Sequence, residues 1–104
     1  MGTQIPGQKT EEDTRTRSKS SLPPLHKVML HNDDYTSMEF VVTILEAVFH
    51  RTPAEANRIM LNVHVEGVGV AGVYPFDIAE TKVKKVHSMA RQEGYPLRCS
   101  MEEE

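Results

Sequence analysis

The pattern of apolar and polar positions changes at about residue 25. A short apolar stretch from Leu25 to Leu30 has strand character and is broken by Asn32. Three later segments, starting near residues 38, 54 and 79, place apolar side chains at helical spacing. Residues 69–75 and 97–101 return to strand character. The predicted order is therefore strand, helix, helix, strand, helix, strand.

This order predicts an α+β fold, a small two-layer sandwich with three helices on one face of a three-stranded sheet. We expect residues 25–104 to form the folded domain. Residues 1–24 differ in kind, because they are rich in Thr, Ser, Gln and mixed charge and end at Pro23-Pro24. A segment with so few apolar side chains cannot offset its ordering entropy, so we expect a disordered tail.

Three helix starts and two helix ends can be predicted from single residues. Thr36 to Glu39 and Thr52 to Glu55 each place a hydroxyl three residues before an acidic side chain, which is the capping-box pattern. Pro53 follows the second cap, at a position that favours proline. Asp77 is expected to cap the third helix. Glycines at 67 and 94 stand where left-handed C-terminal residues belong.

Composition narrows the classes of function. The chain has 104 residues, 38% of them hydrophobic, and a formal net charge of −3, which does not favour nucleic acid as a partner. No apolar run approaches the length of about 18 residues that predicts a membrane span. The N-terminus has no apolar signal region, and Cys99 is the only cysteine, so we expect a cytoplasmic protein.

Three short polar residues, Asn32, Asp33 and Asp34, stand between the first strand and the first helix. Their oxygen atoms are expected at the edge of an apolar patch that contains Met38 and Val41. Such an arrangement favours a ligand with an ammonium group and an apolar side chain. If the first two helices pack as a hairpin, His64 at the end of the second helix reaches the same turn.

Other chemistries have weaker support. The segment Gly67 to Gly72 matches G-x-G-x-x-G, but it follows a helix and enters a strand, which is the wrong context for a dinucleotide. The five histidines lack metal-ligand spacing, and no CxxC motif accompanies them. No Ser or Cys has the strand-to-helix elbow of a hydrolase. We therefore expect no cofactor, no metal and no catalytic residue. A small hydrolase or a metal protein is the alternative from another functional class.

Several ordered motifs resemble the ClpS family of bacterial adaptors. They are Val28 to Thr36, Met38 to Val42, Met60 to His64, Gly72 to Tyr74, and Ala79 to Lys82. The resemblance covers about residues 25–104. It implies a fold similar to the C-terminal domain of the ribosomal stalk protein, in agreement with the predicted order of elements. It also implies an adaptor, not an enzyme, that delivers N-end-rule substrates to the AAA+ protease ClpAP.

The resemblance also implies a role for individual residues. Asn32, Asp34 and His64 match the side chains that hold the substrate's α-amino group, and Asp33 matches a neighbouring acidic position. Six residues match the lining of the family's pocket for the side chain of the substrate's N-terminal residue, called the first side chain below: Leu30, Thr36, Met38, Val41, Met60 and Val63. Met38 matches a gatekeeper that disfavours β-branched side chains, so the expected first residues are Leu, Phe, Tyr and Trp.

The implied protein partner is the N-terminal domain of the ClpA unfoldase. The docking surface is matched by Asp77 and Lys82, with Thr81 as their neighbour. We expect a monomer that acts in complex. The chain departs from the family pattern at Ser37, where the family usually has proline. This difference is expected to affect how strictly the pocket selects the first side chain. A same-fold adaptor for a different degron set or AAA+ partner is the alternative interpretation.

Overall fold

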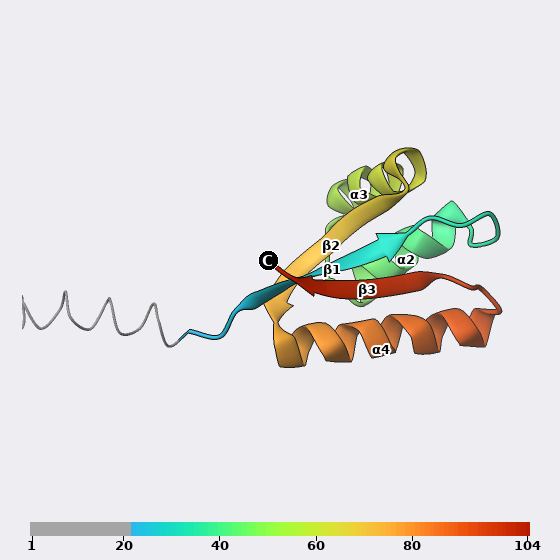
Figure 1. Cartoon of the computed structure of the whole chain (residues 1–104). Coiled ribbons are helices and arrows are strands. Elements are labelled where there is room, and N and C mark those ends of the chain that lie inside the picture. The colour runs from blue at the N-terminus through green and yellow to red at the C-terminus, as the bar shows by residue number, and fades with distance from the viewer. Residues whose placement is uncertain (1–21) are drawn as a thin grey trace, which may run out of the picture.

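The computed structural model describes residues 22–104. Its elements are β1 (Leu25–His31), α2 (Met38–Ala47), α3 (Pro53–Glu66), β2 (Val68–Pro75), α4 (Phe76–Glu93) and β3 (Arg98–Glu103). This order confirms the predicted α+β arrangement, as Figure 1 shows. The predicted tail, apart from residues 22–24, lies outside the described residues. No helix in the described part is both long and apolar enough to cross a membrane.

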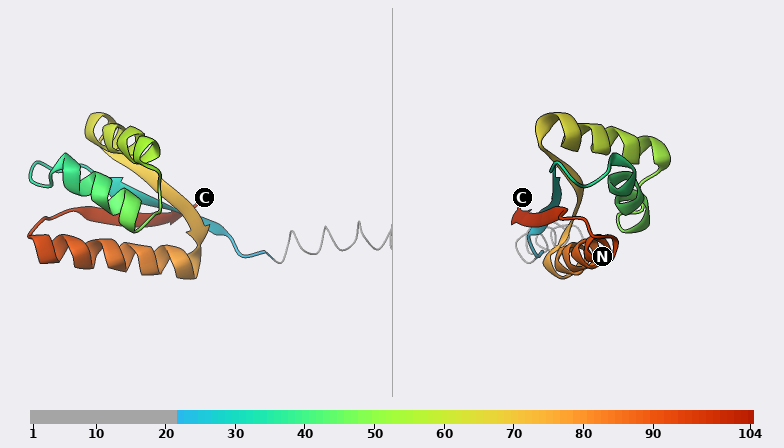
Figure 2. Two further views of the ribbon diagram at one scale, coloured as in Figure 1. Left: turned by 180° about the vertical axis from the view of Figure 1, so that it is seen from behind. Right: turned by 90° about the vertical axis from the view of Figure 1, so that its right-hand side faces the viewer.

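The sheet has β1 at its centre, with β2 and β3 antiparallel on either side. The three helices lie on one side of this sheet, as the two views of Figure 2 show. Val28 and Leu30 of β1 point into that layer and are fully buried. They meet Ile44 and Leu45 of α2 and Val86 of α4 in one continuous core. Burial of these side chains is the main favourable term in folding.

Each outer strand of the sheet has a side chain bonded to its backbone. Val28 pairs with Gly72 and the next residue of β1 pairs with Val70, so Ala71 is an extra, bulged residue of β2. Nε of Arg51 donates a hydrogen bond of 2.9 Å to the Ala71 carbonyl. On β3, the backbone N–H of Cys99 donates to Nε2 of His87 at 3.0 Å. These bonds satisfy backbone groups that the ladder with β1 leaves free.

The caps of α3 agree with the sequence, and the starts of α2 and α4 do not. Thr52 and Glu55 form the complete capping box, with Pro53 in the first turn. The C-terminal glycines have positive φ, +90° at position 67 and +78° at position 94. At α4 the expected cap was wrong, because the N-cap is Pro75 and Asp77 lies inside the first turn. Helix α4 therefore begins without a side-chain hydrogen bond at its cap.

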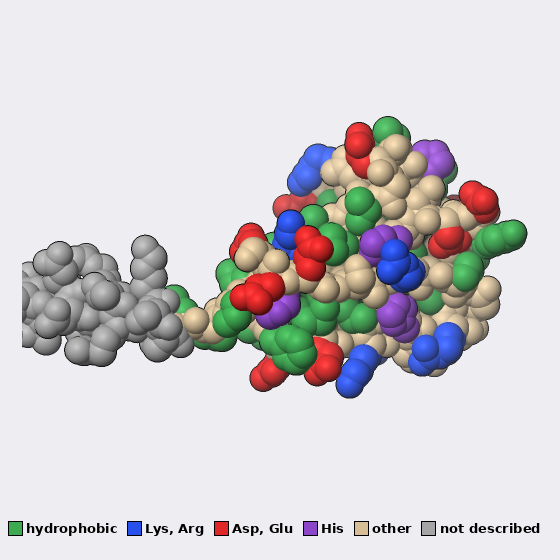
Figure 3. Space-filling model, viewed as in Figure 1, with side chains coloured by type: hydrophobic (Ala, Val, Ile, Leu, Met, Phe, Trp, Pro, Cys, Tyr) green, Lys and Arg blue, Asp and Glu red, His purple; other side chains and the backbone are tan. Residues whose placement is uncertain are grey.

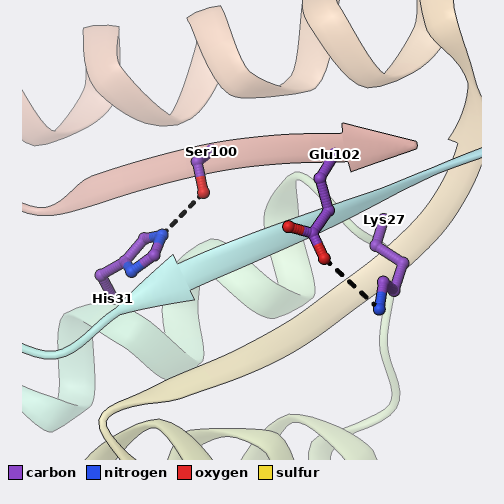
Figure 4. Close-up of polar contacts among 4 residues, drawn as sticks. All are labelled: Lys27, His31, Ser100 and Glu102. Carbon is purple, nitrogen blue, oxygen red and sulfur yellow. Dashed lines mark hydrogen bonds and ion pairs between the residues drawn. The ribbon is translucent and has the colours of Figure 1, made fainter. Parts of the chain in front are cut away.

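The sheet face away from the helices is exposed and polar along β1 and β3. Figure 3 shows histidine and charged side chains spread over this face. Lys27 forms an ion pair of 3.5 Å with Glu102, and Nε2 of His31 lies 2.6 Å from Oγ of Ser100, as drawn in Figure 4. Arg98 lies 3.3 Å from Nδ1 of the same histidine. Polar pairing across adjacent strands suits a sheet face that remains in contact with water.

Candidate functional site

The loop after β1 is organised by the carboxylate of Asp33. Oδ1 accepts hydrogen bonds from the backbone N–H groups of Tyr35 and Thr36, at 2.8 and 2.7 Å. Oδ2 accepts from the Thr36 hydroxyl at 2.8 Å. Partial burial acts to raise the pKa of Asp33, but the bonds from Thr36 and Tyr35 outweigh it and lower the pKa. Asp33 is therefore an ionised support of the loop.

Ser37, and not Thr36, caps α2. The Ser37 hydroxyl accepts a hydrogen bond of 3.1 Å from the backbone N–H of Phe40, while the Thr36 hydroxyl donates to Asp33. The capping box predicted for Thr36 and Glu39 was therefore wrong. Ser37 lies outside the helix, at the N-cap. Serine at this position supplies a side-chain oxygen for capping, which the proline usual in the family does not have.

The end of β1 is tied to the C-terminus of α3. The backbone N–H of Asn32 donates a hydrogen bond of 2.9 Å to the carbonyl of Gly67. His64 lies in the last turn of α3, three residues before that carbonyl. The side chains of Asn32, Asp34 and His64 are exposed, and no hydrogen bond among residues 22–104 engages them. The fold thus brings the chain segments that carry the three predicted acceptors to one end of the domain.

A close contact between β2 and α3 fixes this junction. A Cβ atom at Gly69 would lie 2.8 Å from Cγ2 of Val63 and 3.3 Å from the carbonyl oxygen of Ile59. Because glycine has no side chain, β2 packs directly against the backbone of α3. The sequence predicted that Gly67 ends α3, and its positive φ confirms this.

The predicted pocket residues divide into a buried and a surface set. Leu30, Val41 and Val63 belong to the core. Met60 is partly buried, and Met38 is 49% exposed. Both methionines line a groove of about 460 Å³ between α2 and α3, and its walls are Met38, Glu39, Val42, Thr43, Asn57 and Met60. Four of these residues were not predicted, although Val42 and Asn57 stand one helical turn from the two methionines.

The residues predicted to contact a partner lie on the first half of α4. Asp77 and Thr81 are exposed, and the Thr81 hydroxyl donates to the Asp77 carbonyl at 3.0 Å. Lys82 instead turns toward the domain, where Nζ donates to the Val48 carbonyl at 2.7 Å. Its ammonium also lies 5.1 Å from the ring centre of Tyr74. The structure therefore separates Lys82 from the two exposed side chains.

Metal and thiol chemistry find no support in the described residues. Within residues 22–104, no three His, Cys, Asp or Glu side chains are grouped so that they could hold a metal ion. The Cys99 thiol is buried, and burial raises its pKa to about 12. A thiol with that pKa is almost wholly protonated at neutral pH, so it is a poor nucleophile.

Comparisons with known proteins agree with this geometry. The family described as "ATP-dependent Clp protease adaptor protein ClpS" matches residues 21–100. A ClpS adapter protein of Desulfatibacillum aliphaticivorans is 59% identical over 91 residues, which cover 88% of each chain. One from Nitratidesulfovibrio vulgaris strain Miyazaki F is 65% identical over 81 residues, 78% of this chain and 81% of the relative.

A solved structure is also similar. It is that of Agrobacterium tumefaciens ClpS2 bound to L-phenylalaninamide, with a TM-score of 0.77 and 43% sequence identity. The match covers 80% of this chain and the whole of that one. Fold and sequence together define the class of protein, an adaptor of an ATP-dependent protease. The chain belongs to the ClpS family. It is therefore an adaptor of a Clp protease and not itself an enzyme.

Proposed function

We propose that this adaptor binds the free α-amino group and the large apolar first side chain of N-end-rule substrates and delivers them to the protease ClpAP. The observation that supports the proposal is that Asn32, Asp34 and His64 are exposed and unbonded, while Met38 and Met60 line a groove between α2 and α3. The related ClpS2 was solved with L-phenylalaninamide, a molecule with a free amine and an aromatic side chain.

The amine is recognised by hydrogen-bond acceptors of three kinds. A protonated α-amino group has three N–H donors, and the Asn32 amide oxygen, the Asp34 carboxylate and a neutral His64 nitrogen are matching acceptors. The carboxylate bond is strengthened by charge. Because the Asp33 oxygens already accept three bonds in the loop, Asp34 is the acidic residue that meets the amine.

The first side chain enters between Met38 and Met60. Met60 packs against the core that contains Leu30, Val41 and Val63, and this core would provide the apolar floor of the pocket. Methionine is unbranched and adaptable, so its side chains can repack around rings of different size. Burial of a Leu or Phe side chain contributes roughly 1.5–3 kcal/mol. The preferred first residues are therefore Leu, Phe, Tyr and Trp.

Delivery uses a separate surface on α4. The exposed side chains of Asp77 and Thr81 contact the N-terminal domain of ClpA, whereas Lys82 supports this surface from below through its bond to Val48. The protein acts in the cytoplasm as a monomer. Residues 1–20, which lie outside the described part, are engaged by the unfoldase, so their deletion spares peptide binding and impairs degradation.

The test is fluorescence anisotropy with two labelled peptides that differ only in acetylation of an N-terminal Phe. We expect tight binding of the free form alone. Acetylation removes the positive charge of the amine and leaves acceptors without a hydrogen-bond partner, which costs about 1–3 kcal/mol of binding free energy. Asp34→Asn should weaken binding by about tenfold or more, whereas Asp77→Asn, on α4, should leave it unchanged.

Degradation by ClpAP completes the test. Asp77→Asn should slow degradation of a substrate with an N-terminal Phe, although it binds the peptide normally. Equal binding of free and acetylated peptides would overturn the proposal for the amine. Amine-dependent binding without stimulation of ClpAP would instead favour a same-fold adaptor for a different AAA+ partner.

A further inference from the structure

The outer edge of β2 has backbone groups that β1 does not reach. Strand β2 stands first in the sheet order β2-β1-β3, so β1 occupies only one of its edges. The N–H of Asn32 donates to the Gly67 carbonyl, so Gly67 and Gly69 direct their backbone groups toward β1. This direction alternates along an antiparallel strand, so the N–H and carbonyl groups of Val68 and Val70 point away from β1. Another strand can therefore bond to them.

Arg51 limits this open edge to residues 68–70. The bulged residue Ala71 directs its carbonyl outward, where it accepts the bond from Nε of Arg51. A strand that adds beside Val68 and Val70 therefore ends its ladder at Ala71. Strands as short as about three residues occur in globular proteins, so the open edge is long enough for one. The guanidinium group of Arg51 lies at the end of the edge.

A groove of about 520 Å³, called the β2 groove below, lies along this edge. Helix α3 forms one of its walls, and Figures 1 and 2 show α3 beside β2. Three exposed polar side chains of this wall are spaced by four residues, so they lie in one row along the helix: Arg58, Asn62 and Glu66. The helix thus presents a polar row to the groove.

The sheet wall of the β2 groove is apolar. Gly69 faces α3, so its neighbours Val68 and Val70 face the other side of the sheet. These two valines are 39% and 40% exposed, and Met29 of β1 pairs with Val70. All three apolar side chains line the groove. Branched apolar side chains on an added strand would pack against this wall.

The β2 groove has cations at one end and a carboxylate at the other. Arg51 has four N–H donors besides Nε, and no ion pair within residues 22–104 includes Arg51 or Arg58. Bonds from Thr52 lower the pKa of Glu55, and the charges of both arginines lower it further, so both cations lie near the start of α3. Glu66 stands eight residues after Arg58, which is about 12 Å along a helix.

This separation fits an extended peptide. Such a peptide advances about 3.3 Å per residue, so its positions one and five are about 13 Å apart and share a face. That face would be directed to α3, with position three beside Asn62. Positions two and four would face Val68 and Val70. Because β2 runs from the Glu66 end to the Arg51 end, an antiparallel peptide places position one at the arginines.

We propose that the β2 groove binds an extended segment of a partner protein, antiparallel to β2, with an acidic residue at the arginines and a basic residue four positions later at Glu66. The backbone of Val68 and Val70 bonds to the main chain of this segment, and the two charges set its direction. Antiparallel pairing is the commoner kind in sheets. The segment needs no free α-amino group, so this site is separate from the proposed site for N-terminal residues.

The proposal is tested by NMR titration of the isotope-labelled full chain with two peptides, acetyl-Asp-Val-Thr-Val-Lys-amide and acetyl-Lys-Val-Thr-Val-Asp-amide. They have the same composition and net charge, and acetylation removes the free amine. The first should shift the amide signals of Val68 and Val70. It should bind about three- to tenfold more tightly than the second, as two exposed ion pairs allow.

Methylation of the peptide nitrogens tests the strand geometry without altering the protein. Residues opposite Val68 and Val70 direct their N–H groups to β2, and the residue between them directs its N–H away. Methylation of both valine nitrogens of the first peptide should abolish the shifts. Methylation of the threonine nitrogen should change affinity by less than about twofold, because that N–H makes no bond to β2.

Arg58→Gln and Glu66→Gln test the two charged ends. Each should bring the affinity ratio of the two peptides closer to one, because each removes one of the ion pairs that set the direction. Arg91→Gln is the matched control, since Arg91 is an exposed arginine of α4 that does not line the β2 groove. This variant should keep the ratio of the unaltered protein.

Several results would overturn the proposal. They are the absence of shifts at Val68 and Val70 at millimolar peptide, equal affinity for the two peptides, and equal loss on methylation of the valine and threonine nitrogens. An Arg91→Gln effect as large as that of Arg58→Gln would assign the preference to general electrostatics instead. A peptide with a free N-terminal Phe should bind Arg58→Gln normally, so each proposal can fail without the other.

Discussion

The ammonium group of Lys82 lies 2.7 Å from the backbone carbonyl oxygen of Val48, so a residue of α4 caps the C-terminal end of α2. Helix α2 has no basic residue in its own last turn. A cation at that end satisfies a free carbonyl and complements the helix dipole. The rings of Phe49 and Tyr74 lie 5.8 and 5.1 Å from the same ammonium. Lys82 thereby joins three elements of the fold.

Replacement of Lys82 by Met should therefore destabilise the domain. The aliphatic stem is kept and the hydrogen bond is lost, so we expect a loss of about 1.5 kcal/mol in the free energy of unfolding. Urea unfolding followed by circular dichroism measures this change. Thr81→Ala, at the exposed neighbouring position, should change stability by less than about 0.5 kcal/mol. Equal stability of Lys82→Met and the unaltered protein would mean that the bond contributes nothing.

The loop carboxylate Asp33 predicts a loss of stability in acid. Its pKa is lowered from the ordinary 3.8, so its contribution is present above that value and is lost as pH falls through the folded pKa. Asp33→Asn should cost about 1 kcal/mol at pH 7. The difference between the two proteins should shrink below pH 4. Thermal unfolding at pH 7, 5, 4 and 3 tests this, and a constant difference would contradict the role of ionisation.

His31 predicts a second pH dependence, nearer neutrality. Burial, followed by the charge of Arg98, lowers the pKa of His31 from 6.5. If Arg98 donates to Nδ1, the neutral ring carries its proton on Nε2 and donates to Ser100. Protonation would place a second N–H toward the guanidinium. The folded state thus binds fewer protons, and stability should fall as pH decreases from 6.5 through the folded pKa.

His31→Gln should flatten the dependence of unfolding free energy on pH between 7 and 5. His50→Asn removes an exposed histidine with positive φ, a conformation that asparagine accepts, and it serves as the control. The control should keep the slope of the unaltered protein. A slope that His31→Gln leaves intact would assign the dependence to another group.

Gly69→Ala should disrupt the junction between β2 and α3. The added methyl would approach Val63 to 2.8 Å, so the strand or the helix has to move, at a cost of about 1–3 kcal/mol. Val63→Ala removes the nearer obstacle but not the Ile59 carbonyl. A double-mutant cycle should therefore show partial rescue, with a combined loss smaller than the sum of the single losses. Strict additivity would show that the two positions do not meet.

Much of the fold follows from local signals in the sequence. Periodicity predicted every element in order. Thr52, Gly67 and Gly94 are helix boundaries, as predicted, because an N-cap hydroxyl and a glycine with positive φ depend only on local geometry. Thr36 failed as a cap because Asp33 binds its hydroxyl and leaves the cap to Ser37. Competition among adjacent side chains for the same amides does not appear in a spacing rule.

The candidate site was predictable to a smaller extent. A family resemblance assigned Asn32, Asp34 and His64, yet it could not show that Asp33 is committed to the loop. Nor could it show that Lys82 points inward, because that depends on where α2 ends relative to α4. The groove beside Met38 could not be predicted, because it forms only when two helices pack together, and the side chains that face each other across it are far apart in the sequence.

The side chains bonded to the two outer strands also have a consequence for how the sheet edges meet other extended chains. Extended polypeptides tend to add to exposed sheet edges, and this pairing leads to aggregation. Arg51 occupies the Ala71 carbonyl on one edge, and His87 occupies the Cys99 amide on the other. A strand that adds to either edge would therefore have to displace the bond on that edge before it could continue the ladder. Each edge of the sheet thus offers one backbone group fewer to an added strand, which reduces its capacity to act as a template for β-aggregation.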